Sequence, residues 1–300
     1  MIDEGTASRT TLQISEALAL LGAQLGAGSN LDTSFVNLST LKDKLDPALE
    51  IYADVILHPS FPEADFRRVQ KLQLAGIQQE KDSPTGMALR VLPKLVYGEG
   101  HAYGNPFSGS GYEASVAKLT RDDLVKFHKT WFKPNQATLI AVGDTTMAEL
   151  KPRLEKLFRG WEGGQVPKKN IGVVALKKSA VYILDKPDSP QSFILAGHAA
   201  PSSADPENIA IETMNLVLGG DFISRINMNL RENKHWSYGA MSFLPGARGQ
   251  RPLIVYAPVQ ADKTKESIAE IKLEFEGVLG QKPVTPDEFS NVKASQVLGL

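Results

Sequence analysis

One segment of this sequence occurs twice, about 220 residues apart, and this repeat restricts the possible folds more than any other feature. Pro62 to Val69 (PEADFRRV) reappears as Pro286 to Val292 (PDEFSNV). Each copy follows an amphipathic stretch, which is Pro47 to Leu57 in the first case and Ser267 to Leu279 in the second. A repeat at one fixed offset indicates two copies of one structural unit.

The elements upstream of the two copies occur in the same order, a helix-like run followed by two strand-like runs. In the first copy these are Leu12 to Leu25 and then Leu31 to Leu41, and in the second they are Ile223 to Glu232 and then Tyr238 to Val259. Two units of about 220 residues need about 440 residues, whereas the chain has 300. We therefore interpret the sequence as a fragment of a longer protein, in which both units are truncated.

The alignment of the two copies also gives domain boundaries. We expect a first unit over residues 1–160, which lacks its N-terminal strands and helix, and a second unit over residues 178–300, which lacks its C-terminal part. Residues 161–177 contain glycines and a proline and predict a linker. Two strand-like runs at the start of the second unit, Val181 to Leu184 and Phe193 to His198, have no counterpart in the first.

Local patterns predict the individual elements. Thr33 to Leu41 alternates in polarity and is typical of a half-buried strand, and Ala137 to Val142 predicts a buried strand. Helices are expected over Glu63 to Lys81, from Pro84 to Tyr97, and after the capping residue Thr120. Because the strands come as hairpins and the helices come in pairs, the patterns favour an α+β fold in which each unit has a largely antiparallel sheet with helices packed on one face.

Composition excludes several classes of function. Lysine and arginine number 33 against 34 aspartates and glutamates, so no positive surplus favours nucleic acid or an anionic membrane as a partner. The chain has no cysteine, which leaves histidine, aspartate and glutamate as metal ligands. No apolar run approaches the roughly 20 residues that a membrane span needs.

The histidines do not form a metal-binding motif by themselves. They are His58, His101, His128, His198 and His235, and no two are three or four residues apart. No helix can therefore present two imidazoles from adjacent turns to one metal ion. We expect each ring to face solvent or to make a single hydrogen bond.

Glu80 is the first candidate for a functional side chain. It shares the inward stripe of its predicted helix with Phe66 and Ile77, and Gln73 is a second polar residue on that stripe. A carboxylate in the last turn of a helix also opposes the helix dipole. Two interpretations stay open, a solvated helix end and a metal ligand or buried acceptor.

Arg231 and Tyr238 are the second candidates. They are seven residues apart and span a predicted helix end and strand start. An arginine presents a planar fork of donors, and a tyrosine hydroxyl can polarise a carbonyl group. A surface salt bridge and a core tyrosine would explain the pair equally well.

Several short motifs occur together in this chain. They are Leu218 to Ile226 (LGGDFISRI), Leu230 to Glu232 and Trp236 to Ala240 (WSYGA), preceded by Tyr97-Gly98, His101 to Gly104, Thr120 to Leu124, Pro134-Asn135 and Val142 to Asp144. Over essentially the whole chain they resemble the insulinase-like (pitrilysin) zinc metallopeptidases, in the bacterial processing-protease branch. The resemblance leaves the compartment open between periplasm and cytoplasm.

The resemblance implies a fold and a chemistry. The family builds a closed chamber around an extended peptide from repeated α+β units, as in processing peptidases, and its zinc motif is His-x-x-Glu-His on a helix. A further glutamate completes the ligand set, and Glu80 matches its position. Arg231 and Tyr238 match an arginine and a tyrosine that grip the substrate backbone.

The start of the chain departs from the active pattern. Met1 to Thr6 (MIDEGT) occupies the stretch that directly follows the zinc motif in active members, so the two histidines would fall just before Met1. The Asp-Glu-Gly-Thr version resembles the non-catalytic halves and partner subunits of the family. Gln73, where active members commonly carry an acidic residue, agrees with this interpretation.

Three hypotheses follow. The leading one is a non-catalytic half or subunit that binds extended peptide through Arg231 and Tyr238, binds no zinc by itself, and completes the chamber of a homologous zinc-bearing partner. The first alternative is an active zinc endopeptidase whose motif lies just before Met1. The second alternative is a purely structural subunit of an assembly. The printed chain lacks the zinc motif, so we expect it to be inactive alone.

Overall fold

The computed structural model of this protein describes residues 1–299. Contacts divide the chain into two compact units, each of which is made of two segments. The first unit contains Met1–Ile77 and Gly111–Lys169, and the second contains residues 78–110 and the chain from Asn170 onward. Compactness therefore groups residues 78–110 with the second half of the chain. The division into repeated units at 161–177 stays a prediction.

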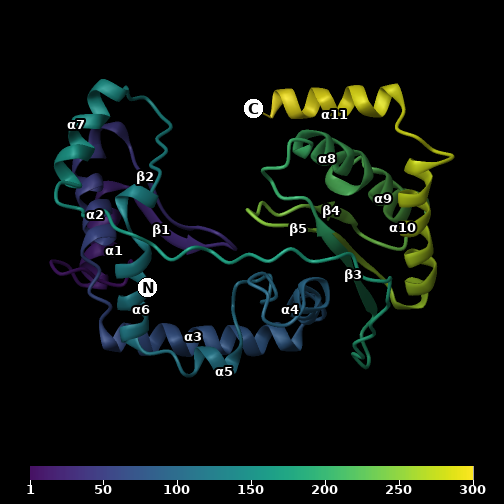
Figure 1. Cartoon of the computed structure of the whole chain (residues 1–300), viewed down its shortest axis with the longest axis horizontal. Coiled ribbons are helices and arrows are strands. Elements are labelled where there is room, and N and C mark those ends of the chain that lie inside the picture. The colour runs from purple at the N-terminus through teal and green to yellow at the C-terminus, as the bar shows by residue number, and fades with distance from the viewer. Residues whose placement is uncertain (300) are drawn as a thin grey trace. The chain divides into compact units, whose positions relative to one another are not determined.

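The first unit combines a small sheet with several helices (Figure 1). In chain order its elements are α1 (Thr11–Leu21), β1 (Gln24–Ser29), β2 (Ser34–Ser39), η1 (Lys42–Lys44), α2 (Leu45–Leu57), most of α3 (Glu63–Asp82), α5 (Glu113–Val116), α6 (Arg121–Trp131), η2 (Pro134–Gln136) and α7 (Met147–Leu157).

The hairpin and two helices form the core of this unit. β1 and β2 are antiparallel, with Gln24 opposite Ser39 and Ser29 opposite Ser34. The buried cluster consists of Ile14, Leu18, Ala23, Ala48, Ile51 and Val55, mainly from α1 and α2. Removal of these apolar side chains from water is the main force that holds the helices together.

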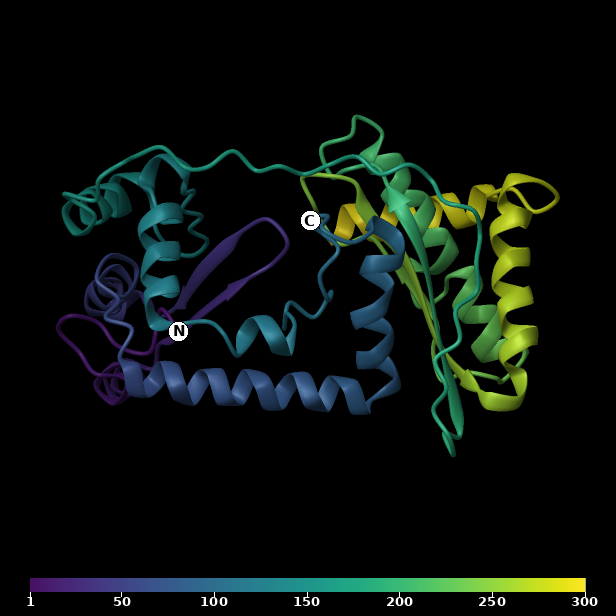
Figure 2. The same ribbon diagram turned by 60° about the horizontal axis from the view of Figure 1, so that its bottom comes forward.

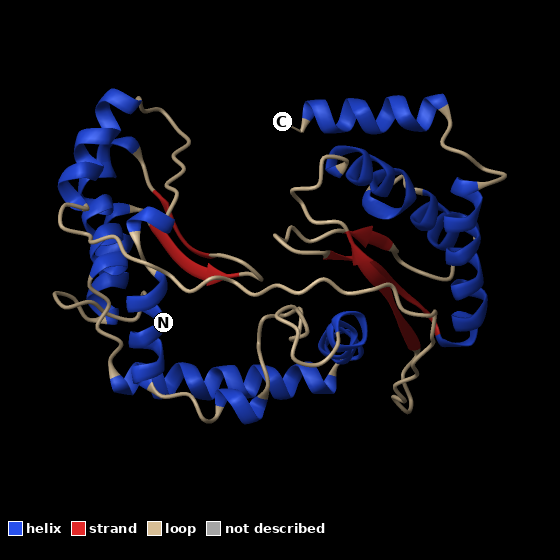
Figure 3. Cartoon of the chain, in the orientation of Figure 1, coloured by secondary structure: helices blue, strands red, loops and turns tan. Residues whose placement is uncertain are grey.

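The second unit contains a three-stranded sheet and a larger set of helices (Figure 3). Its elements are the end of α3, α4 (Pro84–Tyr97), β3 (Gln191–Ala200), α8 (Asn208–Asn215), η3 (Leu216–Gly220), α9 (Arg225–Asn227), η4 (Met228–Asn233), β4 (Met241–Phe243), β5 (Arg251–Gln260), η5 (Ala261–Lys263), α10 (Thr264–Leu279) and α11 (Pro286–Leu298).

β5 is the central strand of this sheet. It lies between β3 and β4, and both neighbours are antiparallel to it. β3 pairs with it along the full length, from Gln191 opposite Gln260 to Ala200 opposite Arg251. Figure 2 shows α4 on one side of the sheet and α8 to α10 on the other, which explains why most of β5 is buried. The predicted α+β class with antiparallel sheets is confirmed.

The order of elements repeats along the chain. α1, β1, β2, η1, α2 and α3 follow one another in the first half, and α9 with η4, β4, β5, η5, α10 and α11 follow in the second. Even the short 3-10 helical turn after the second strand recurs, as Lys42–Lys44 before α2 and as Ala261–Lys263 before α10.

Helix boundaries with strong local signals are confirmed. α3 covers Glu63–Asp82 and α4 covers Pro84–Tyr97, while Thr120 caps α6 by accepting a hydrogen bond from the backbone of Asp123. The corner between α3 and α4 is tight, because a Cβ atom on Gly86 would lie 2.3 Å from the carbonyl oxygen of Glu80. Only glycine fits there without a shift of the backbone.

The predicted helix from Leu12 to Leu25 is too long. α1 ends at Leu21 because Gly22 adopts a left-handed conformation, with φ of 60°, and closes the helix. Leu25 then lies in β1 and packs on the same core from a strand. The apolar spacing correctly predicted the burial of Ile14 and Leu18, but Leu12 is 66% exposed and Leu25 belongs to a strand and not to the helix.

Two predicted strands are also wrong. Ala137 to Val142 and Val181 to Leu184 are irregular and largely exposed, with Ile140 83% and Ile183 89% accessible. A buried strand needs a neighbouring strand to satisfy its backbone, and neither run has one among the described residues.

Candidate peptide-binding site

Arg231 lies near the end of a helical segment of the second unit, and an aromatic ring contacts its side chain. Its guanidinium carbon lies 4.6 Å from the centre of the Phe222 ring, a cation–π distance. Its Nε atom also lies 3.2 Å from Oε1 of Glu232. The surface salt bridge considered from the sequence is therefore present, and the Phe222 contact is an additional one.

Tyr238 lies in the open segment before β4 and not in the core. Its side chain is 87% exposed, so the core-tyrosine interpretation is wrong. The backbone on either side is nevertheless fixed, because the Ser237 hydroxyl donates to the Pro258 carbonyl at 2.6 Å and accepts from the Gly239 N–H at 3.1 Å. An exposed phenol on a held backbone is available to a ligand.

Two π-helical turns frame this region, and the sequence patterns did not reveal them. They are η3 (Leu216–Gly220) and η4 (Met228–Asn233), and Arg231 lies in η4. Turns of this type insert one extra residue into a helix and occur frequently at functional sites. Their presence in the motif that carries Arg231 agrees with a binding role.

His235 follows η4 in a strained conformation. Its φ angle of 57° is unusual for a residue other than glycine. Nδ1 of its ring lies 3.1 Å from the carbonyl oxygen of Arg231, within hydrogen-bond distance. Such strain is maintained only where surrounding contacts impose it.

Glu80 is held by a positive partner. Its Oε2 atom accepts from Nη1 of Arg90 at 2.6 Å and from the Ser110 hydroxyl at 2.7 Å. Burial raises the pKa of the Glu80 carboxyl, but the hydrogen bonds from Ser110 and Arg90 outweigh it, and the pKa lies below its ordinary value. Glu80 is thus a part-buried acceptor at the end of α3, whereas Gln73, expected on the packed face, is exposed.

The five histidine rings are dispersed. Four have a nitrogen atom within hydrogen-bond distance of a backbone carbonyl oxygen, at Gly172 for His101, Ile56 for His128, Ala199 for His198 and Arg231 for His235. The ring of His58 lies 3.4 Å from Asp54 instead. Each ring thus has one such polar contact, in agreement with the single hydrogen bond expected from the sequence.

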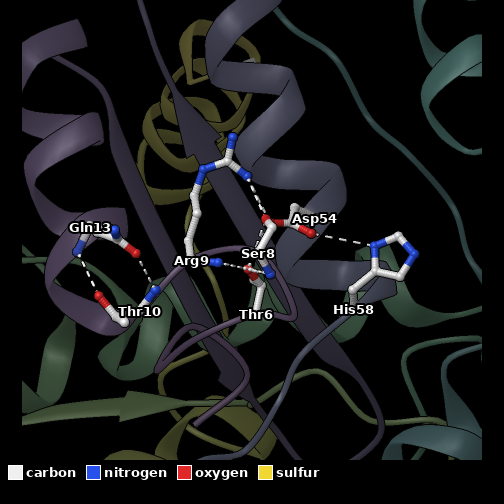
Figure 4. Close-up of polar contacts among 7 residues, drawn as sticks. All are labelled: Thr6, Ser8, Arg9, Thr10, Gln13, Asp54 and His58. Atoms are coloured by element: carbon white, nitrogen blue, oxygen red, sulfur yellow. Dashed lines mark hydrogen bonds and ion pairs between the residues drawn. The ribbon is translucent and has the colours of Figure 1, made fainter.

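A polar cluster near the N-terminus was not anticipated from the sequence (Figure 4). Oδ2 of Asp54 accepts from the Thr6 hydroxyl at 2.7 Å, the Ser8 hydroxyl at 2.6 Å and Nη1 of Arg9 at 2.8 Å. Burial raises the pKa of Asp54, but these bonds outweigh it and the pKa is lowered. Ser8 donates to Asp54 and not to His58, so the cluster anchors the N-terminal loop on α2 and is not a Ser-His relay.

Comparison with known families gives the class of the protein. The family model described as "Peptidase M16 inactive domain" matches residues 118–296, and the model described as "Insulinase (Peptidase family M16)" matches residues 1–104. The chain belongs to the insulinase family, peptidase family M16. The resemblance inferred from the sequence motifs is confirmed.

Individual relatives agree with this family. An uncharacterized zinc protease of Bacillus subtilis, YmxG, is 22% identical over 98% of this chain, and one of Mycobacterium leprae is 24% identical over 86%. The chain spans 70% of the first relative and 58% of the second.

Solved structures share the fold. A peptidase M16 inactive domain from Pseudomonas fluorescens superposes with a TM-score of 0.91 at 25% identity, covering 99% of this chain and 71% of that one. A protease from Helicobacter pylori gives a TM-score of 0.83 at 18% identity, covering 99% and 72%. No helix within residues 1–299 is both long and apolar enough to cross a bilayer.

Zinc, which the names of the relatives imply, does not fit the described residues. Zinc sites use three or four protein ligands, and nowhere in residues 1–299 do three histidines or carboxylates gather. The carboxylate of Glu80 is already engaged by Arg90 and Ser110. Its correspondence to a zinc-ligand position stays a prediction.

Proposed function

We propose that this chain is part of a non-catalytic half or subunit that holds an extended peptide and completes the chamber of a zinc-bearing peptidase partner. Arg231 and Tyr238 supply the contacts to the peptide backbone. The observation that carries the proposal is the exposure of Tyr238 together with the stacking of Arg231 on Phe222. Both side chains are presented to solvent without being needed for the core.

The ion pair of Glu80 supports the non-catalytic part of the proposal. A carboxylate whose charge is already balanced by the mostly buried guanidinium of Arg90 attracts a metal ion less strongly than a free carboxylate. The match of residues 118–296 to the M16 inactive domain supports it as well.

We also propose that the chain contains an internal duplication. The repeated order of elements supports it, and so do two arginines that follow a serine, Ser8-Arg9 and Ser224-Arg225, at the start of each series. Arg9 binds Asp54 on α2, and Arg225 binds Glu288 on α11. The two arginines share their place at the start of each series, while their partner helices, α2 and α11, hold different places in the order of elements.

An active zinc endopeptidase is the second candidate, and the names of the curated relatives favour it. The full-length protein decides between the two. We expect less than stoichiometric zinc by elemental analysis, no peptide hydrolysis by the protein alone, and hydrolysis when the zinc-bearing partner is added. One zinc ion per full-length protein, with hydrolysis in the absence of a partner, would overturn the non-catalytic proposal.

Peptide binding is measured separately by fluorescence anisotropy of labelled extended peptides. Arg231→Ala and Tyr238→Phe are expected to weaken binding by about tenfold each. Arg159→Ala and Tyr182→Phe are matched controls on exposed residues of the same types and should leave the affinity unchanged. If all four variants bind the peptide with the affinity of the wild type, Arg231 and Tyr238 do not contact it, and a purely structural subunit is favoured.

A further inference from the structure

We infer that Asn227 is a positioning residue that fixes Arg231 and Tyr238 relative to each other, with Phe222 as the link to Arg231. The inference rests on the proposed function, because it concerns how the same site is held. Asn227 is only 4% exposed, lies in α9, and is outside every motif considered from the sequence.

The side-chain amide of Asn227 joins two backbone segments. Its Nδ2 atom donates to the carbonyl oxygen of Phe222 at 2.6 Å, and its Oδ1 atom accepts from the N–H of Ala240 at 3.0 Å. A carbonyl can only accept and a backbone N–H can only donate, so the partners determine the orientation of the amide. Only asparagine offers a donor and an acceptor in this geometry.

The first segment controls Arg231. The Phe222 ring is 60% exposed, so core packing does not fix it, and its place depends on the backbone that Asn227 holds. That ring lies 4.6 Å from the guanidinium of Arg231. A shift of Phe222 would therefore leave the guanidinium without its aromatic support.

The second segment controls Tyr238. Ala240 is two residues further along the chain and is buried, and the Ser237 hydroxyl fixes the other side of Tyr238 through Pro258. The backbone of Tyr238 is thus held on both sides, by the hydrogen bond from Ser237 to Pro258 and by the hydrogen bond from Ala240 to Asn227.

Asn215 provides a matched control. It is 7% exposed and also uses both ends of its amide, donating from Nδ2 to the Ser242 carbonyl at 3.2 Å and accepting at Oδ1 from the Ser242 hydroxyl at 2.7 Å. Both of its contacts go to β4 and neither goes to Phe222 or Ala240. A buried asparagine that only stabilises the fold should behave like Asn215.

The test compares Asn227→Asp with Asn215→Asp in the full-length protein. Each substitution removes one buried donor and should lower the melting temperature. Asn227→Asp alone is expected to weaken the affinity for the labelled peptide by about tenfold, because its carboxylate repels the Phe222 carbonyl. In an Arg231→Ala, Tyr238→Phe background the same substitution should change affinity by less than about twofold.

Substitutions of Phe222 provide a second test of the inference if Asn227→Asp does not fold. Phe222→Leu should weaken peptide binding, because it removes the aromatic ring beside the guanidinium of Arg231. Phe222→Tyr should bind the peptide as the wild type does, because a tyrosine ring can support the guanidinium as well. Equal affinity losses for Asn227→Asp and Asn215→Asp, or no effect of Phe222→Leu, would overturn the inference while Arg231→Ala still reports on the proposed function. If Arg231→Ala itself has no effect, the proposed function fails first.

Discussion

Arg225 and Glu288 form a two-point ion pair that joins α9 to the first turn of α11. Nε to Oε1 and Nη2 to Oε2 are both 2.7 Å, and Nη2 also donates to the Pro283 carbonyl at 2.9 Å. Hydrogen bonds from Arg225 lower the pKa of Glu288 to about 2. The pair therefore holds the loop between α10 and α11 against the helix that leads to the candidate site.

This ion pair predicts an acid-sensitive contribution to stability. The pKa of Glu288 is lowered by folding, so its contribution is present above the ordinary value of 4.5 and is lost as the pH falls toward about 2. Glu288→Gln should reduce the free energy of unfolding at pH 7 by about 1–2 kcal/mol. The difference between wild type and variant, measured by urea denaturation, should shrink from pH 6 to pH 3.

Asp287→Asn is the control for this measurement, because Asp287 lies in the same helical turn and is exposed. If the difference in free energy of unfolding between wild type and Glu288→Gln stays constant with pH, the pairing with Arg225 does not govern the titration of Glu288.

The Glu80 contacts predict a graded loss of stability. Glu80→Gln keeps an acceptor for Arg90 and Ser110, whereas Glu80→Ala leaves the Arg90 side chain, which is 9% exposed, without this carboxylate. We expect Glu80→Ala to lower the free energy of unfolding by about 2 kcal/mol and Glu80→Gln to lower it by less. Glu99→Gln on an 86% exposed side chain should cost nothing measurable. A loss of bound zinc in the full-length Glu80→Gln protein, with unchanged stability, would instead assign Glu80 to a metal site.

Two glycines on neighbouring helices predict opposite effects of one substitution. Gly86→Ala places a Cβ atom 2.3 Å from the Glu80 carbonyl and should destabilise by about 2 kcal/mol or more. Gly76→Ala meets nothing within 4 Å inside α3 and should stabilise by about 0.5–1 kcal/mol. Thermal unfolding of the two variants measures both, and equal effects would contradict the tight corner between α3 and α4.

His128 predicts a loss of stability in mild acid. Burial lowers the pKa of this imidazole below 6.5, and its Nε2 atom lies 2.8 Å from the Ile56 carbonyl. Because the unfolded chain then binds a proton more readily than the folded one, the free energy of unfolding should fall as the pH drops below 6.5. His128→Gln should show a smaller fall between pH 8 and pH 5.5, while His198→Gln, on an exposed ring, should behave as wild type.

Local signals in the sequence were sufficient for several helices. Pro84 to Tyr97 was correct at both ends because Ser83 caps the start and Gly98 follows the last turn. The strand predicted over Ala137 to Val142 failed because burial of a strand depends on a neighbour elsewhere in the chain, which a run of apolar residues does not specify.

The candidate site was predictable only as a pair of residues. The motif around Arg231 and Tyr238 is visible in the sequence. The contact of Phe222 involves Arg231 in a π-helical turn that no side-chain period revealed, and Asn227 joins the backbone of Phe222 to that of Ala240, which lies 13 residues beyond Asn227 in the chain. The Asp54 cluster was missed for a similar reason, since its partners lie 45 to 48 residues away in the chain. Contacts of this range follow from the fold and not from spacing.

The winding of η4 makes the length of this segment as important as its composition. Each residue of a regular α-helix turns the chain by about 100°, so deletion of one residue between Met228 and Leu230 would rotate Arg231 away from the Phe222 ring even with Arg231 and Phe222 themselves retained. Relatives that differ before Arg231 by a single insertion or deletion would thus lose this geometry even where Phe222, Asn227 and Arg231 are all present.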